Sequence, residues 1–283
     1  MSTNPATPVP VTVVPDARPA EVVIISHSPL FYWWPVWAVG FVMAAWTFLQ
    51  DQRVAFVPPG TVAERNVQVE GQQGKRDILI APEGRSLPAE SDTEELKQPR
   101  MRMAISNGPG MIWFMTMMLV IIVTHVKMRG AWSLAAAGLI VALIVLFAVF
   151  GVWDIIFRAL GFIDIHINAL GYLSISLFLL VMWLLMFFVF DRLTYMIFTR
   201  GRLRLRKAIG EGEKVFDMRG MVFQRHRDDM FRHWLLGFFT ADLTVFTSGA
   251  NAQQIEMPNV FGIAHKLTLI NTMLQELEVT KAR

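Results

Sequence analysis

Residues 193–206 read LTYMIFTRGRLRLR and mark the point where an apolar chain becomes rich in β-forming residues. The first seven are mostly β-branched or aromatic, Arg200-Gly201 is a turn dipeptide, and Arg202–Arg206 alternates charged and apolar side chains. This pattern predicts a β-hairpin whose second strand has one charged face. Directly before it, residues 169–190 are almost wholly apolar and long enough to cross a hydrocarbon core of ~30 Å as a helix. A β-rich domain is therefore predicted to begin where a membrane helix ends.

The composition supports a membrane protein with sizeable polar segments. The chain has 283 residues, of which 54% are hydrophobic, and its mean hydropathy is +0.43. Soluble domains contain roughly 45–50% apolar residues. Cysteine is absent, which excludes disulfides, thiolate metal sites and a cysteine nucleophile. The net charge is +3, and a basic domain next to a bilayer is drawn to anionic headgroups rather than to nucleic acid.

Hydropathy divides the chain into five segments. We expect a flexible cytoplasmic tail over residues 1–30, followed by a first transmembrane helix over 31–49. An extracytoplasmic loop with a small β element should follow over 50–110. Three further transmembrane helices are expected within 111–190, with a connector at 152–168, before a cytoplasmic β domain over 191–283. Lys and Arg are more numerous beside the helix ends that would face the cytoplasm. This bias predicts a multi-pass protein of the cytoplasmic (inner) membrane with both termini inside.

The last segment contains several short strand patterns followed by one helix pattern. After the hairpin, 213–218 and 221–227 flank the turn Arg219-Gly220, residues 231–239 read as an apolar strand, and 242–247 alternates again. Pro258-Asn259 is then expected to open a helix. Apolar residues recur along that helix at spacings of three and four, at Val260, Ile263, Leu267, Ile270, Leu274 and Leu277. The fold class predicted is a four-helix membrane region followed by an antiparallel β-sandwich or barrel with a capping C-terminal helix.

That layout resembles the bacterial pleckstrin-homology-like (PH-like) domain family over about the last 90 residues. The residues that carry the likeness are Leu193-Thr194, Arg202-Leu203, Leu235-Leu236-Gly237, Asp242–Val245 and Ile255–Val260. The resemblance implies a PH-like fold and a non-enzymatic role as a scaffold or at a membrane surface.

The candidate ligand-binding residues are the basic ones of the hairpin, Arg200, Arg202, Arg204, Arg206 and Lys207. They form either a solvated face that obeys the positive-inside rule or a dock for anionic lipid headgroups. In a dock, each residue near the surface would contribute on the order of 1 kcal/mol.

A second group of ionisable residues lies in the connector. Asp154 and Arg158 have the i,i+4 spacing of a helical ion pair, and Asp164 and His166 follow. They read as an interfacial structural pair or as part of a proton or ion path.

A third group has residue types that bind metals, namely His226, Asp228, Asp229 and His233. The alternative, purely structural interpretation of these four residues is a polar turn before an apolar strand. P-loop, G-x-S-x-G, H-E-x-x-H and strand-linked G-x-G-x-x-G motifs are absent from the sequence. We therefore predict a protein that is not an enzyme and holds no cofactor and no metal.

The function predicted is a scaffold or adaptor at the inner membrane surface that binds anionic lipid, partner proteins or copies of itself, but not nucleic acid. The alternative is a component or regulator of a transporter or channel built on the second to fourth membrane helices. Against the alternative, the interiors of the predicted spans carry no charge and no central proline.

Overall fold

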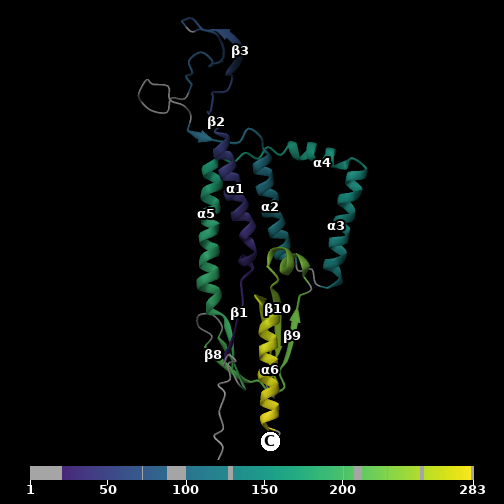
Figure 1. Cartoon of the computed structure of the whole chain (residues 1–283). Helices are drawn as coiled ribbons and strands as arrows, with labels where there is room; N and C mark the ends of the chain where they lie inside the picture. Colours follow the sequence, from purple (N-terminus) through teal and green to yellow (C-terminus); the bar gives the residue numbers. More distant parts are fainter. Residues whose placement is uncertain are drawn as a thin grey trace, which may run out of the picture. The chain divides into compact units, whose positions relative to one another are not determined.

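The structure is a computed structural model, and it describes residues 21–71, 73–87, 100–126, 130–199, 201–206, 212–227, 229–248 and 252–281. The chain forms two compact units (Figure 1). The first, which we call the β unit, takes its described residues from Met1–His27, Phe190–Arg227 and Phe239–Arg283. The second, the helical unit, is formed by Ser28–Val189 and Asp228–Phe238.

The β unit contains two antiparallel sheets and one long helix. The four-stranded sheet has the order β1-β6-β7-β8 and the three-stranded sheet the order β11-β10-β9. The bounds are β1 (Glu21–Ile25), β6 (Tyr195–Thr199), β7 (Arg202–Arg206), β8 (Glu213–Asp217), β9 (Val222–His226), β10 (Ala241–Phe246), β11 (Gln254–Val260) and α6 (Ile263–Lys281).

One hydrophobic core joins both sheets and α6. Alternation sends Leu203 and Leu205 of β7 into this core, while the three arginines that alternate with them stay exposed. Leu243 of β10 and Ile270 of α6 contribute fully buried side chains to the same cluster. Each such side chain contributes roughly 1.5–3 kcal/mol by leaving water. The predicted antiparallel sheets with a C-terminal helix are therefore present.

The N-terminal strand β1 differs from the expectation of a flexible tail over residues 1–30. It pairs along the whole of β6, from Glu21 opposite Thr199 to Ile25 opposite Tyr195. Its alternate residues Val22 and Ile24 are buried in the core of the β unit. The boundary predicted at residue 191 thus leaves out an edge strand of the four-stranded sheet.

Two further expectations within the β domain are wrong in detail. Pro258 lies inside β11 instead of opening a helix, and α6 begins only at Ile263. An edge strand tolerates proline because one side of it needs no ladder hydrogen bonds, and β11 is at the edge of its sheet. The predicted apolar strand at 231–239 is instead the π-helical segment η4 (Met230–Leu236), which belongs to the helical unit.

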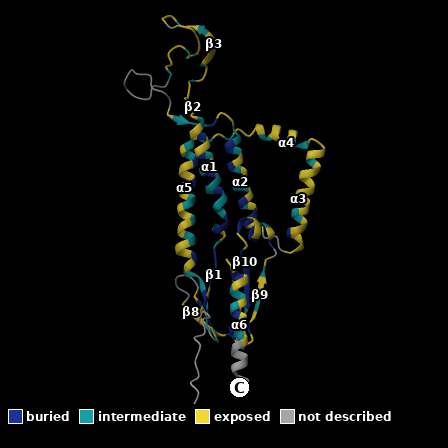
Figure 2. Ribbon diagram, viewed as in Figure 1, coloured by how far each residue is buried: buried dark blue, intermediate teal, exposed yellow. Residues whose placement is uncertain are grey.

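The described residues contain four helices that are long and apolar enough to cross a membrane, as predicted. They belong to the helical unit, except that the last one continues to Leu193, within the β unit. These candidate spans are Pro29–Gln50, Gly108–His125, Ala131–Val149 and Ala169–Leu193. The first joins η1 (Pro29–Trp33) to α1 (Trp34–Gln50), the second is α2 (Gly108–His125), the third is α3 (Ala131–Val149), and the last runs through α5 (Ala169–Leu185), η2 (Met186–Phe190) and η3 (Asp191–Leu193). The connector forms α4 (Val152–Gly161). Apolar side chains along α3 are exposed nearly throughout (Figure 2).

Close packing joins α1 to α2 and α5. A Cβ atom at Gly40 would collide with Ser176 Oγ of α5, so glycine favours this close approach. Trp113 Nε1 of α2 donates a 3.0 Å hydrogen bond to the carbonyl of Val36 in α1. The three helices thereby form one packed group.

The described residues between α1 and α2 form two β-ribbons. Strands β3 (Val62–Gln68) and β4 (Lys75–Ile80) pair as a largely exposed hairpin, where the sequence predicted a small β element. Strands β2 (Arg53–Val54) and β5 (Met101–Arg102) pair just beyond the end of α1. This short ribbon brings Arg102 next to residues that follow α1.

Candidate functional site

The arginines predicted to bind lipid headgroups lie on the outer face of the four-stranded sheet. Arg202, Arg204 and Arg206 are exposed on β7. Arg200 and Lys207 lie outside the described residues. The alternation of the sequence thus correctly identified the side of the strand on which the arginines lie.

Acidic residues accompany these arginines across the strand pairs. Asp217 is opposite Arg202, and Glu213 is opposite Arg206 and lies 3.7 Å from Arg204. Such exposed pairs contribute little stability, but they offset the positive charge of the strand.

Arg206 has a second partner on the opposite strand. Its NH1 donates a 3.3 Å hydrogen bond to the hydroxyl of Tyr195. This hydrogen bond, together with the electrostatic effects of Tyr195 and Glu213, raises the pKa of Arg206 above its usual value despite desolvation. The side chain is therefore oriented along the sheet instead of extending freely into solvent.

The central row of this face is largely apolar. The strand register brings Val23, Ile197, Arg204 and Val215 into one row across the sheet. Val23 and Val215 are exposed at 41% and 56%. Charged pairs around an apolar row are typical of a surface that contacts protein.

The connector residues form two separate local pairs. Arg158 Nε donates to the backbone carbonyl of Asp154 at 3.1 Å. His166 Nδ1 lies 2.8 Å from Asp164 Oδ1, and this aspartate is 79% exposed. Both contacts are short-range and solvent-accessible, which favours the structural interpretation over an ion path.

The four residues with metal-binding side chains do not assemble into a site in the described part of the chain. No group of three or more His, Cys, Asp or Glu side chains there is arranged to hold a metal ion. His226 lies on β9, Asp229 and His233 belong to η4, and Asp228 lies outside the described residues.

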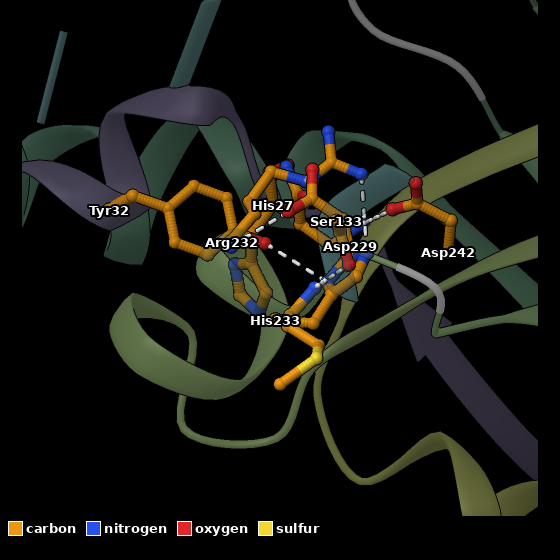
Figure 3. A network of polar contacts seen from close by, with 9 residues as sticks. His27, Tyr32, Ser133, Asp229, Arg232, His233 and Asp242 are labelled. Carbon is orange, nitrogen blue, oxygen red and sulfur yellow. Dashed lines mark hydrogen bonds and ion pairs between the residues drawn. The ribbon is translucent and has the colours of Figure 1, made fainter. Parts of the chain in front are cut away.

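His233 instead belongs to a buried polar network in the helical unit (Figure 3). Its Nδ1 lies 3.5 Å from the hydroxyl of Tyr32, and its Nε2 lies 3.2 Å from Arg232 NH2. Asp229 caps η4 by accepting a 3.0 Å hydrogen bond from the Arg232 backbone N–H. Its second carboxylate oxygen is 3.8 Å from Arg232 Nε. These buried contacts join η4 to Tyr32 of η1, so this network reads as an anchor for η4.

Two more contacts attach η4 to the candidate membrane helices α1 and α3. Trp34 Nε1 of α1 donates to the Leu236 carbonyl at 3.0 Å, and the Met230 N–H donates to Ser133 Oγ of α3 at 3.5 Å. Sequence reasoning missed this anchor because its members are about 100 to 200 residues apart.

A second buried cluster lies in the β unit, where the chain passes into the helical unit after His27 and where it re-enters the β unit at Phe190. His27 Nδ1 lies 3.0 Å from Asp191 Oδ2, and both side chains are nearly inaccessible. Asn259 Nδ2 donates to the His27 carbonyl at 2.8 Å, and Ser26 Oγ donates to the Pro258 carbonyl at 2.9 Å. The residues just before the first candidate span and just after the last turn of η2 are therefore held together.

The helical unit also contains a cavity of about 750 Å³ between the end of α1 and the start of α5. Its walls are mainly apolar, with Arg100, Arg102 and Asn168 among the lining residues. Hydropathy does not predict this cavity, because it shows that a helix is apolar but not which of its faces leave a space.

Comparison with known proteins identifies no relative: no family model matches the chain, and no curated protein or solved structure is significantly similar to it. Function is therefore inferred from the residues and contacts described above.

Proposed function

We propose that the chain is a multi-pass scaffold of the cytoplasmic membrane whose β unit is a PH-like domain that docks a partner protein. The strand orders support the family resemblance, because four strands in one sheet, three in the other and a C-terminal helix share one core. Strand β1 is the edge strand of the four-stranded sheet, next to β6.

The observation that carries the proposal is the pairing of β1 with β6. Strand β1 precedes the four candidate spans, and β6 follows them. Two strands hydrogen-bonded in one sheet must lie on the same side of a membrane, so the chain between them crosses an even number of times. Four crossings satisfy this condition, and the Lys and Arg near the ends of these spans favour the cytoplasm for that side.

The chain connections suit a scaffold. The β unit continues into the first candidate span after His27 and is entered again at the C-terminal end of the last span, where His27 contacts Asp191. A domain tethered by two chain segments stays at the membrane surface at high local concentration. It can therefore present a binding face without needing lipid affinity of its own.

The outer face of the four-stranded sheet is the proposed docking surface. Three arginines there are accompanied by Glu21, Glu213 and Asp217 in the same rows of the sheet. An anionic bilayer would repel these carboxylates, whereas a protein partner can complement both signs of charge. The exposed apolar row through Val23 and Val215 also favours a protein.

Site-specific photo-crosslinking in cells tests this proposal on the full chain. A photoreactive residue at Thr199 or Val215 should give an adduct of the same mass, and the same probe at Ala264, exposed on α6, should not. The Thr199 adduct should disappear in a Val215→Asp variant, which places a carboxylate in the apolar row. Absence of adducts from both face positions would contradict partner docking.

The lipid alternative has its own measurement. Hydrogen exchange of the full chain should show equal protection of β7 in nanodiscs with and without anionic lipid. If β7 is protected only by anionic lipid, and if salt or replacement of Arg202, Arg204 and Arg206 by Gln removes that protection, the arginines bind headgroups and the proposed partner surface is wrong.

A further inference from the structure

The cavity in the helical unit combines a hydrocarbon-like interior with a cationic rim. Its apolar walls include Phe41 and Phe48 of α1 and Leu170 and Leu173 of α5. Two arginines, Arg100 and Arg102, line it as well. A volume of about 750 Å³ lies within the roughly 300–1,000 Å³ that small-molecule sites occupy. Apolar walls and cations together select an amphipathic anion.

Backbone pairing connects residues 102 and 103, at the rim of the cavity, to the end of α1 and the start of α5. Arg102 is opposite Arg53 in the β2–β5 ribbon, directly after the end of α1. The next residue, Met103, donates its N–H to the Gln52 carbonyl at 3.1 Å and forms a β-bridge with Asn168. Asn168 is the N-cap of α5. Backbone pairing therefore fixes the position of Arg102 in the rim.

Asp51 organises the charges at the rim. Its Oδ1 accepts hydrogen bonds from Arg102 Nε at 2.8 Å and from Arg53 Nε at 3.2 Å. Desolvation raises the pKa of Asp51, but the charges and hydrogen bonds of Arg53 and Arg102 outweigh it and lower the pKa below 3.8. Asp51 is thus ionised near neutral pH and pairs with both Arg53 and Arg102.

The guanidinium group of Arg102 is held in place by contacts that leave its NH1 and NH2 groups available as hydrogen-bond donors among the described residues. Its guanidinium carbon lies 3.9 Å from the centre of the Phe48 ring, so stacking holds the planar group at the cavity wall. Within the described part of the chain, its hydrogen bonding uses only Nε, toward Asp51. The NH1 and NH2 groups are the fork that binds two oxygens of a phosphate.

We propose that this cavity binds an anionic phospholipid, with an acyl chain between α1 and α5 and the phosphate at Arg100 and Arg102. The location supports a lipid over a soluble anion, because α1 and α5 belong to candidate membrane spans and the arginines lie at their ends. The ends of a span of ~30 Å are at the depth of lipid headgroups. Basic pockets between transmembrane helices bind such headgroups. This site is separate from the β unit and does not rest on the function proposed for it.

The test uses the delipidated full chain in detergent and native mass spectrometry with added phosphatidylglycerol or phosphatidylcholine. Phosphatidylglycerol should be retained preferentially by the wild-type chain. Replacing Arg100 and Arg102 by Gln should weaken its retention roughly thirty-fold, from about one interaction of 1 kcal/mol per arginine. The matched control replaces Arg65 and Arg76 by Gln on the β3–β4 hairpin, which removes two exposed arginines away from the cavity lining and should leave retention unchanged.

A variant with the opposite expected effect protects the test against misfolding. Asp51 has φ +48°, in the left-handed region, and asparagine adopts this conformation at helix ends more readily than other residues with a Cβ. Asp51→Asn therefore keeps the backbone while it removes the carboxylate that accepts the hydrogen bond from Arg102 Nε. Phosphatidylglycerol should then bind several-fold more tightly, because each charge near the surface changes affinity by about five-fold.

A cavity-filling variant separates chain binding from charge attraction. Ala45 lines the cavity and is exposed on α1, so Ala45→Trp should reduce retention of both lipids without changing the charge. The proposal is overturned if the two lipids bind equally, if the arginine and Asp51 variants both leave retention unchanged, or if inorganic phosphate at millimolar concentration displaces the lipid completely.

Discussion

Replacement of Ile24 tests whether the N-terminal strand belongs to the core of the β unit. Ile24 is fully buried between the sheets, whereas its neighbour Val23 is 41% exposed on the other face of the same strand. Truncating a buried isoleucine to alanine costs about 3 kcal/mol, from lost transfer energy and the remaining cavity. Val23→Ala is the matched control, and its cost should stay within about 0.5 kcal/mol.

The absence of cysteine makes the measurement direct. A single cysteine at Val245, fully buried on β10, reacts with a thiol reagent only when the β unit opens, so its labelling rate reports the open population. A cost of about 3 kcal/mol raises this rate roughly 150-fold, and 0.5 kcal/mol raises it about two-fold. Ile24→Val should fall between the two.

Equal labelling rates for Ile24→Ala and Val23→Ala would refute the assignment. The β domain would then fold from residues 191–283 alone, and β1 would not contribute to its opening free energy. The inference that the chain crosses a membrane an even number of times would lose its structural basis as well.

Three further outcomes are expected. Single cysteines at Ser91 and Thr280 should label oppositely with an impermeant reagent in intact cells; labelling of 280 alone would mean an inverted topology. Ile270→Asp should bury a carboxylate at a cost of several kcal/mol and abolish the cooperative melt of the β unit, whereas Thr268→Asp, on the exposed side of α6, should not. Lys266 is half-buried, and desolvation lowers its pKa from 10.5. Its charged form is therefore disfavoured by folding, and this penalty is present below the folded pKa and is relieved as pH rises toward 10.5. Lys266→Met should stabilise the β unit at neutral pH and abolish this rise; a variant with an unchanged stability profile between neutral pH and 10.5 would exclude the effect.

The parts of the fold that follow from local patterns were predictable from the sequence. A long apolar run has few alternatives to a buried or membrane helix, and all four runs form helices. The hairpin from Tyr195 to Arg206 was also predictable, because strict alternation and a Gly turn specify both the strands and the exposed face.

The parts that depend on distant partners were not predictable from the sequence alone. Residues 21–25 have the composition of a strand, but nothing local indicates that the partner is β6. The segment 230–236 has an apolar composition that fits a strand, yet Asp229 caps it as a helical turn and Arg232 and His233 are buried in contacts to other elements.

The candidate site shows the same division. Alternation located Arg202, Arg204 and Arg206, but the acidic residues opposite them depend on the register of β7 with β8. The rim of the cavity depends on Asp51 meeting Arg102 across 51 residues of chain. Charge counts near a helix end cannot distinguish an arginine that is available to a ligand from one that is paired.

The pairing of β1 with β6 also sets the order of events during synthesis. Strand β1 leaves the ribosome before β6, and about 170 residues must follow it before β6 exists. At ~5–20 residues per second, this delay lasts on the order of ten to thirty seconds. Throughout that time, β1 has an unpaired edge and its side chains Val22 and Ile24 lack their core. The β unit can therefore complete its sheet only after the last of the four apolar helices has been made, so a chain that stops earlier would carry an exposed strand that protein quality control can recognise.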